Sequence, residues 1–131
     1  MSASDRLFAY GSLRAGSGHP MHDRLAAAGT FLGHGTMRGL LVAVDDARYP
    51  GLVEAEPATD VHGDVWTVHD RNLWATLDDY EGDEYVRRRR PIGLRDGGTV
   101  EAWVYLFVAS WRGLPTIAGG DWLAYLGLAP P

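Results

Sequence analysis

A glutamate at the end of a predicted helix is the residue best placed for proton transfer. In this helix the apolar residues Leu73, Trp74 and Leu77 recur at helical spacing. Glu81 follows them by eight, seven and four residues, so its side chain lies on the same helix face and points inward. Burial raises the pKa of a carboxyl group, and the negative end of the helix dipole near Gly82 acts in the same direction. Such a group can both accept and donate a proton near neutral pH.

Spacing alone leaves two structural interpretations of Glu81 open. Its side chain could turn outward at a frayed helix end, or it could pair with one of the consecutive arginines Arg87–Arg90. Asp78 and Asp79 lie about 100 to 200° around the helix from the apolar stripe, so both are expected in water. In a strand, Arg87–Arg90 would alternate between two faces, which indicates a solvated, salt-bridged strand and not a nucleic-acid site.

A turn near the start of the sequence is the second feature that could bind a ligand. The apolar strand predicted at 6–10 ends at Gly11, which is followed by Ser12 and Leu13. Glycine lets the backbone turn with its N–H groups close to a ligand, a geometry suited to carboxylate or phosphate oxygens. A Gly-Ser pair at a strand end is also a common plain turn, so the motif by itself does not decide between the two.

The composition excludes several kinds of chemistry. The 131 residues contain no cysteine and no lysine, and all 12 basic residues are arginines. Thiolate nucleophiles, cysteine-ligated metals, lysine Schiff bases and the lysine of a phosphate-binding loop are therefore excluded. The formal charge of −5 disfavours sequence-independent binding to nucleic-acid phosphates. The remaining chemistry must use Glu, Asp, His, Ser, Tyr or a cofactor.

The histidines do not form a recognisable metal site. His19 and His22 are three residues apart, but Pro20 between them disrupts the helix that would bring both onto one face. The other three are scattered along the chain: His34, His62 and His69. Gly33-His34-Gly35 lacks the third glycine of a dinucleotide-binding turn and precedes a predicted strand. We therefore expect no metal and no Rossmann-type site.

Short apolar segments separated by turn signals predict one domain over residues 1–131. We expect strands at 6–10, 30–37, 40–44, 52–55, 62–68, 85–94 and 99–108, the last two joined by a hairpin at Asp96-Gly97-Gly98. Helices are expected at 21–28, at 70–81 with Asp70 as N-cap, and as a short turn at 121–126. This pattern indicates an α+β domain built round a curled sheet or barrel. No apolar run approaches the roughly 20 residues of a membrane helix, so we expect a cytoplasmic protein.

Two motifs taken together resemble the gamma-glutamylcyclotransferase-like family. One is Phe8-Ala9-Tyr10-Gly11-Ser12-Leu13. The other is Leu77-Asp78-Asp79-Tyr80-Glu81-Gly82, followed by Tyr85-Val86-Arg87. The pair is more specific than either motif, and the segments 49–52 and 61–66 also resemble strands of the family. The correspondence runs from about Arg6 to Phe107, whereas the segment 108–131 matches nothing in the recognised pattern.

The resemblance implies a small mixed β-barrel or curled sheet with flanking helices, and an enzyme that needs no cofactor or metal. The substrate's own α-amine would attack its γ-amide carbonyl and release 5-oxoproline and a free amine. Glu81 matches the family's catalytic glutamate and would move the proton, and Arg87 would hold Glu81 or an acidic neighbour. The turn formed by Tyr10, Gly11, Ser12 and Leu13 would bind the α-amino-acid end of the gamma-glutamyl group. Two further tyrosines, Tyr85 and Tyr105, would line the pocket.

Several properties stay open at this point. The leaving amine could come from an amino acid, a polyamine or a modified antibiotic intermediate, whereas glutathione-specific relatives form a separate, longer group. The N–H groups of the turn could hold the α-carboxylate or the developing oxyanion. The expected partner is a small gamma-glutamyl substrate, without nucleic acid or membrane, and the chain is expected to be a monomer or homodimer. The alternative to an enzyme is a non-catalytic binder of a small amino-acid-like ligand, but pure binding does not need an inward Glu81.

Overall fold

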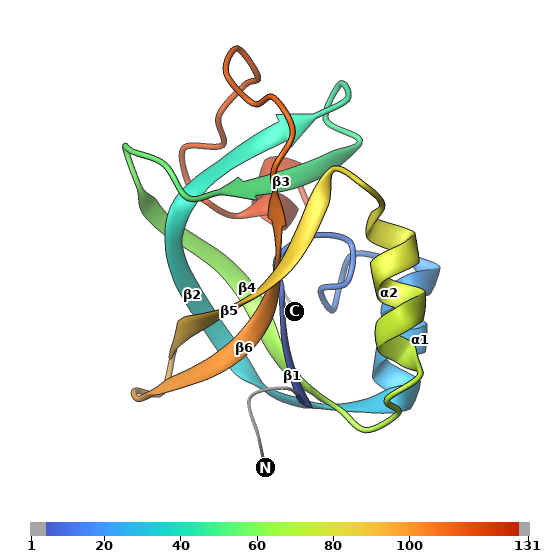
Figure 1. Cartoon of the computed structure of the whole chain (residues 1–131). Coiled ribbons are helices and arrows are strands. Elements are labelled where there is room, and N and C mark those ends of the chain that lie inside the picture. Colours follow the sequence, from blue (N-terminus) through green and yellow to red (C-terminus); the bar gives the residue numbers. More distant parts are fainter. Residues whose placement is uncertain (1–4, 129–131) are drawn as a thin grey trace.

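The strands form a mixed sheet that closes into a barrel (Figure 1). The computed structural model describes residues 5–128. The strands are β1 (Arg6–Ala9), β2 (Gly29–Val44), β3 (Tyr49–Val53), β4 (Thr59–Val68), β5 (Tyr85–Leu94) and β6 (Thr99–Phe107). Their order is β1-β4-β2-β3-β6-β5, and β1 also pairs with β6, so the sheet returns to its first strand. Because β6 runs parallel to β1 and β3 while the other pairs are antiparallel, the predicted mixed barrel is confirmed.

The longest strand, β2, replaces the two separate strands that the sequence predicts at 30–37 and 40–44. Gly39 lies between the two expected segments but continues the strand, where it pairs with Thr59 of β4. A Cβ atom at Gly39 would lie 2.6 Å from Leu52 Cδ1, so the glycine permits the close approach of β3 and does not mark a turn. The predicted break between 37 and 40 was wrong, because pairing with β4 continues through both intervening residues.

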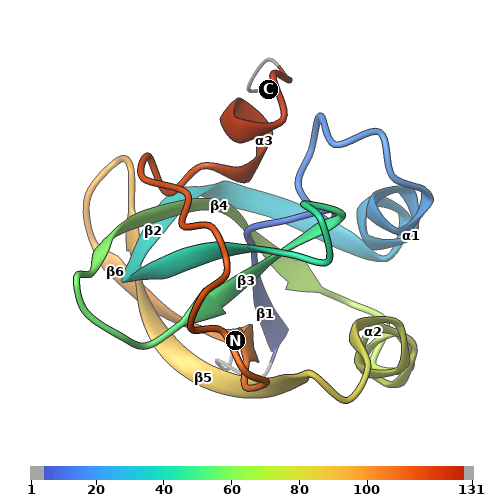
Figure 2. The same ribbon diagram turned by 90° about the horizontal axis from the view of Figure 1, so that it is seen from above.

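The three helices in the described residues are α1 (Pro20–Ala28), α2 (Leu73–Glu81) and α3 (Trp122–Tyr125). Two of them, α1 and α2, flank the same side of the barrel (Figures 1 and 2). The expected N-cap of α2 was wrong: the Asp70 carboxylate accepts the Asn72 N–H at 3.0 Å, which stabilises a turn before the helix. The end of α2 is as predicted, because Gly82 has a φ of 80° that favours glycine. None of the helices in residues 5–128 is long and apolar enough to cross a bilayer.

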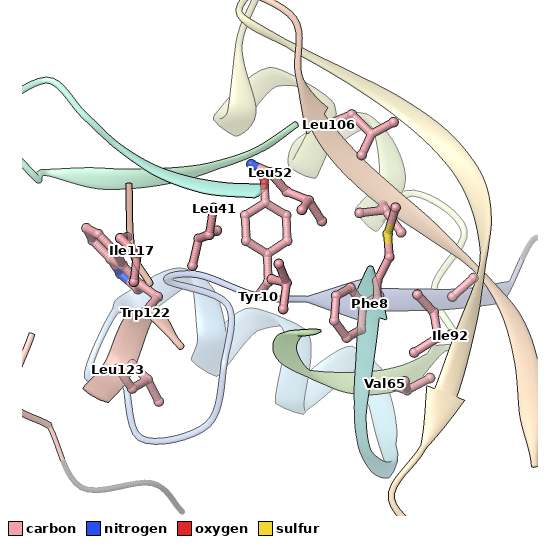
Figure 3. Close-up of a cluster of buried hydrophobic side chains, with 14 of the residues drawn as sticks. Phe8, Tyr10, Leu41, Leu52, Val65, Ile92, Leu106, Ile117, Trp122 and Leu123 are labelled. Atoms are coloured by element: carbon pink, nitrogen blue, oxygen red, sulfur yellow. Dashed lines mark hydrogen bonds between the residues drawn. The ribbon is translucent and has the colours of Figure 1, made fainter. Parts of the chain in front are cut away.

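Alternation along β1 divides the core into two layers. Phe8 and Tyr10 point into the barrel, where they pack among side chains from the surrounding strands (Figure 3). Leu7 and Ala9 point to the outer face and belong to the cluster that α1 and α2 cover. The loop after β1 therefore leaves the barrel at the boundary between these two layers.

After β6, the chain returns to the barrel. Ile117, Trp122 and Leu123 are buried in the barrel core (Figure 3). The backbone joins β2 as well, because the Ile117 N–H donates to the Leu41 carbonyl at 2.8 Å. The segment after Phe107, which matched nothing in the recognised family pattern, thus contributes to the core of the barrel, and the helical turn predicted at 121–126 is present as α3.

Candidate active site

A pocket of about 270 Å³ lies between the loop after β1, the end of α2 and the start of β5. Its lining includes every residue that the sequence analysis assigned to the site: Tyr10, Gly11, Ser12, Leu13, Glu81, Tyr85 and Tyr105. The other lining residues are Phe8, Ala9, Tyr49, Pro50, Tyr80 and Glu84. Within the described part of the chain, two carboxylates and no arginine or histidine side chain line the pocket. The pocket is therefore acidic and rich in tyrosine.

Glu81 is the last residue of α2 and is partly buried. Burial raises the pKa of its carboxyl group from 4.5 to about 7, because desolvation disfavours the charged form. Across residues 5–128 no arginine or histidine forms an ion pair with this carboxylate. A carboxyl group with a pKa near 7 can exchange a proton in either direction at neutral pH.

Two of the four arginines of β5 bind acids other than Glu81. Arg87 donates to both oxygens of Asp78, from Nε at 2.8 Å and from Nη2 at 3.1 Å. Arg90 makes the same two-pronged contact with Glu54, at 2.6 and 2.7 Å. Of the two partners that the resemblance allowed for Arg87, the acidic neighbour is the one observed. Glu81 is thus left without the cation that would lower its pKa.

Tyr10 and Gly11 shape the loop at the pocket floor. The Tyr10 hydroxyl donates to the Tyr105 carbonyl at 2.6 Å and accepts the Leu52 N–H at 3.2 Å. Burial raises the pKa of Tyr10 well above its usual value, so the hydroxyl keeps its proton, and its hydrogen bonds join the end of β1 to the backbone of β3 and β6. A Cβ atom at Gly11 would lie 2.8 Å from Pro50 Cγ. Only glycine therefore lets the loop lie against Pro50 on the opposite wall.

A buried aspartate of β4 anchors the chain just after this loop. The side chain of Asp64 is 0% exposed, accepts the Ala15 N–H at 2.8 Å and lies 3.0 Å from His34 Nδ1. Arg14 is also buried, lies 3.9 Å from Asp64 and donates to Asp121 at 2.8 Å. Sequence reasoning missed this anchor, although a charged residue within an apolar strand was a usable signal.

Tyr85 and Tyr105 use their hydroxyls to hold the pocket wall. The Tyr85 hydroxyl donates to the Pro50 carbonyl at 2.6 Å, and the Tyr105 hydroxyl donates to Asp78 Oδ1 at 2.7 Å. Burial is the main cause that raises the pKa of both tyrosines, so both stay protonated. The hydroxyl hydrogens of both tyrosines are therefore taken up by acceptors of the protein itself.

Three further polar residues of the lining were not assigned from the sequence. The Tyr80 hydroxyl lies 2.6 Å from Ser12 Oγ, and the Tyr49 hydroxyl donates to Glu84 at 3.3 Å. Tyr80 immediately precedes Glu81 in the recognised motif, and that position was a signal. Tyr49 lies in the segment 49–52 that resembles a strand of the family, but nothing local assigned it or Glu84 to the site, because only the folded barrel brings the two residues together.

Comparison with known proteins supports the recognised motifs. The sequence model of the family described as "Gamma-glutamyl cyclotransferase, AIG2-like" matches residues 7–124. The family match continues past Phe107, where the recognised correspondence stopped. It therefore includes most of the segment after β6, which returns to the barrel core. The "Gamma-glutamylcyclotransferase family protein YtfP" of Escherichia coli K12 is 32% identical over 124 residues, which cover 90% of this chain and 96% of that protein.

Solved structures share the fold. An AIG2-like protein from mouse superposes with a TM-score of 0.72 at 25% identity, over 86% of this chain and 85% of that chain. A protein specific to uropathogenic E. coli superposes with a TM-score of 0.73 at 25% identity, over 94% of this chain and 95% of that chain. With a family match from residue 7 to residue 124, the chain belongs to the AIG2-like gamma-glutamylcyclotransferase family.

Proposed function

We propose that this chain is a cyclotransferase that releases 5-oxoproline and a free amine from a gamma-glutamyl amide. The observation that carries the proposal is Glu81, a partly buried carboxyl group without an ion-pair partner among the described residues. It faces the same pocket as the Gly11-Ser12 turn. Its pKa of about 7 suits a group that must first accept a proton and then return it.

In the proposed reaction Glu81 moves two protons, one after the other, from the attacking nitrogen to the leaving nitrogen of the substrate. The α-ammonium group becomes nucleophilic when Glu81 accepts its proton. The amine nitrogen then bonds to the γ-carbonyl carbon, which closes a five-membered ring and shifts an electron pair onto the carbonyl oxygen. When the carbonyl re-forms, the bond to the leaving nitrogen breaks and protonated Glu81 gives its proton to that nitrogen. The Glu81 carboxylate then takes the second proton from the ring nitrogen, which leaves the N–H of 5-oxoproline, and passes it to the released amine, which departs as an ammonium. No water is consumed, and Glu81 ends in its starting state.

The pocket contributes shape as well as the proton acceptor. An extended gamma-glutamyl chain must curl before its two ends can react, and holding it curled supplies several kcal/mol toward the barrier. A positioned acid and base raise the reaction rate by about 10²- to 10⁴-fold. The N–H groups of Gly11 and Ser12 are the proposed donors for the α-carboxylate or for the developing oxyanion. The leaving amine stays open, and the cytoplasm remains the compartment predicted from the sequence.

Release of 5-oxoproline from a panel of gamma-glutamyl amines and gamma-glutamyl amino acids tests the proposal. We expect turnover of at least one compound and its loss in Glu81→Gln, which keeps the shape of the side chain but cannot accept a proton. Asp79→Asn is the matched control, because it neutralises an exposed carboxylate two residues away. No turnover of any compound, or unchanged turnover in Glu81→Gln, rejects the assignment. Stoichiometric binding without product, measured by calorimetry, would favour the non-catalytic binder.

A further inference from the structure

Three side chains from separate segments form a hydrogen-bonded chain beside the pocket. Ser12 belongs to the loop after β1, Tyr80 to α2, and His19 to the turn that leads into α1. Ser12 Oγ lies 2.6 Å from the Tyr80 hydroxyl, which in turn lies 3.2 Å from His19 Nε2. The His19 and Tyr80 rings also meet edge to face, with centroids 5.3 Å apart. The reaction proposed above uses neither Tyr80 nor His19.

The backbone determines which nitrogen of His19 carries the hydrogen. His19 is the N-cap of α1, and its Nδ1 accepts the Met21 N–H at 3.0 Å. A ring nitrogen that accepts a hydrogen bond cannot carry a hydrogen itself, so the neutral ring is protonated on Nε2. The Nε2–H group then donates to the Tyr80 oxygen, because that oxygen is the partner within reach.

Because Tyr80 accepts a hydrogen bond from His19, it donates its own hydrogen to Ser12. Burial raises the pKa of Tyr80, and neighbouring Glu81 acts in the same direction, so the phenol keeps its hydrogen at neutral pH. With its oxygen already accepting from His19, the phenol satisfies its own hydrogen by donating to Ser12 Oγ at 2.6 Å. The Ser12 oxygen is then an acceptor, and its own hydrogen is free to turn into the pocket that Ser12 lines.

We propose that His19 and Tyr80 are positioning residues that hold the Ser12 side chain as a hydrogen-bond donor toward a carboxylate or carbonyl oxygen of the substrate. This inference rests on the proposed function and adds a side-chain donor to the backbone donors already named. The charge of the pocket favours such a device. Glu81 and Glu84 line it, and within the described residues no arginine or histidine does, so substrate oxygens must be held by neutral donors. If the two hydrogen bonds that link these three side chains ran in the opposite direction, Ser12 would donate its hydrogen to Tyr80 and would have none left to donate to the substrate.

A double-mutant cycle on kcat/KM for 5-oxoproline release at pH 8 tests the coupling. We expect Ser12→Ala and Tyr80→Phe each to lower kcat/KM about tenfold, because each removes one oriented hydrogen bond. The double variant should be at most about twofold worse than Ser12→Ala, because without the Ser12 hydroxyl Tyr80 has nothing to orient. Effects that multiply to about a hundredfold would assign Tyr80 an independent role and overturn the proposal. An unchanged kcat/KM in Tyr80→Phe would also overturn it.

Further variants separate positioning from packing. His19→Asn keeps a side-chain oxygen for the helix cap but removes the ring that reaches Tyr80, so we expect an unchanged melting temperature and kcat/KM lowered about three- to fivefold. Ser12→Thr, which keeps a hydroxyl, should retain most of the activity that Ser12→Ala loses. Tyr125→Phe is the matched tyrosine control, because Tyr125 is exposed on α3 and does not line the pocket.

A measurement without substrate distinguishes this proposal from the proposed function. At a pH at which the His19 ring is neutral, its ring-nitrogen chemical shifts in the wild-type protein should show a hydrogen on Nε2 and none on Nδ1. A hydrogen on Nδ1 would overturn the chain of donors, whether or not the protein is an enzyme. If instead wild type gives no 5-oxoproline while the His19 shifts are as expected, the cyclotransferase assignment fails and so does any role of Ser12 toward its substrate.

Discussion

Ionisation of Glu81 in its pocket should destabilise the folded chain. Burial raises the pKa of this carboxyl group from 4.5 to about 7. The two values differ by about 2.5, and each pKa unit corresponds to about 1.4 kcal/mol, so the charged form is disfavoured by about 3 kcal/mol in the folded protein. The folded pKa lies above the unfolded one, and the folded state therefore binds more protons between pH 4.5 and 7. Stability from this group is present below pH 4.5 and is lost as the pH rises through 7.

Urea unfolding of wild type and Glu81→Gln across this pH range measures the effect. The glutamine cannot ionise, so the variant should be more stable than wild type by about 3 kcal/mol at pH 8. At pH 4.5 the difference should shrink to a few tenths of a kcal/mol, because Glu81 is then protonated in the folded state. Asp79→Asn supplies the baseline for removing an exposed carboxylate from the same helix turn.

The comparison between pH 4.5 and pH 8 is decisive because other groups titrate equally in wild type and variant. If the difference in the free energy of unfolding between wild type and Glu81→Gln stays constant over this pH range, Glu81 titrates alike in the folded and unfolded chain. The pocket would then not shelter the carboxyl group, and the physical basis for a proton acceptor at neutral pH would be lost.

Three other outcomes are expected. The kcat/KM for 5-oxoproline release should fall about tenfold per pH unit below pH 7, since the proton acceptor must be ionised, and a flat profile from pH 5 to 7 would contradict the role of Glu81. Asp64→Asn should lower the free energy of unfolding by about 1 to 3 kcal/mol in urea, because an amide NH2 group then replaces one of the two buried oxygens that face the Ala15 N–H and His34 Nδ1, and an unchanged stability would argue against the anchor. Gly11→Ala should lower kcat/KM about tenfold through the Cβ contact with Pro50 and destabilise the fold by about 1 to 3 kcal/mol, whereas wild-type kinetics would show that the loop can move aside.

The parts of the site that the sequence predicts are those governed by local periodicity. Helical spacing puts Glu81 on the face of Leu77, and the end of α2 at Gly82 follows from the conformation that glycine allows. The strand that stops at Gly11 is equally local. These features depend on residues within about eight positions of one another, so a single sequence contains the information.

The parts that the sequence does not predict depend on contacts between distant segments. Asp64 holds Ala15 across 49 residues and contacts His34 across 30. The continuity of β2 through Gly39 was not predicted because it depends on pairing with Thr59 of β4 and on the close approach of Leu52 from β3. The packing of Trp122 into the barrel likewise depends on the closed sheet, which exists only after all its strands have paired.

The ion pair between Arg14 and Asp121 joins the end of the pocket loop to the last helix of the barrel. Loss of Asp121 would leave the buried Arg14 guanidinium with Asp64, 3.9 Å away, as its remaining acidic neighbour, so a change at one position is expected to favour a compensating change at the other. Among natural relatives the two positions are therefore expected to covary, with an apolar or neutral pair replacing both charges together. The contacts that hold the loop after β1 thus extend 107 residues along the chain, to the start of a helix that contributes no residue to the pocket lining.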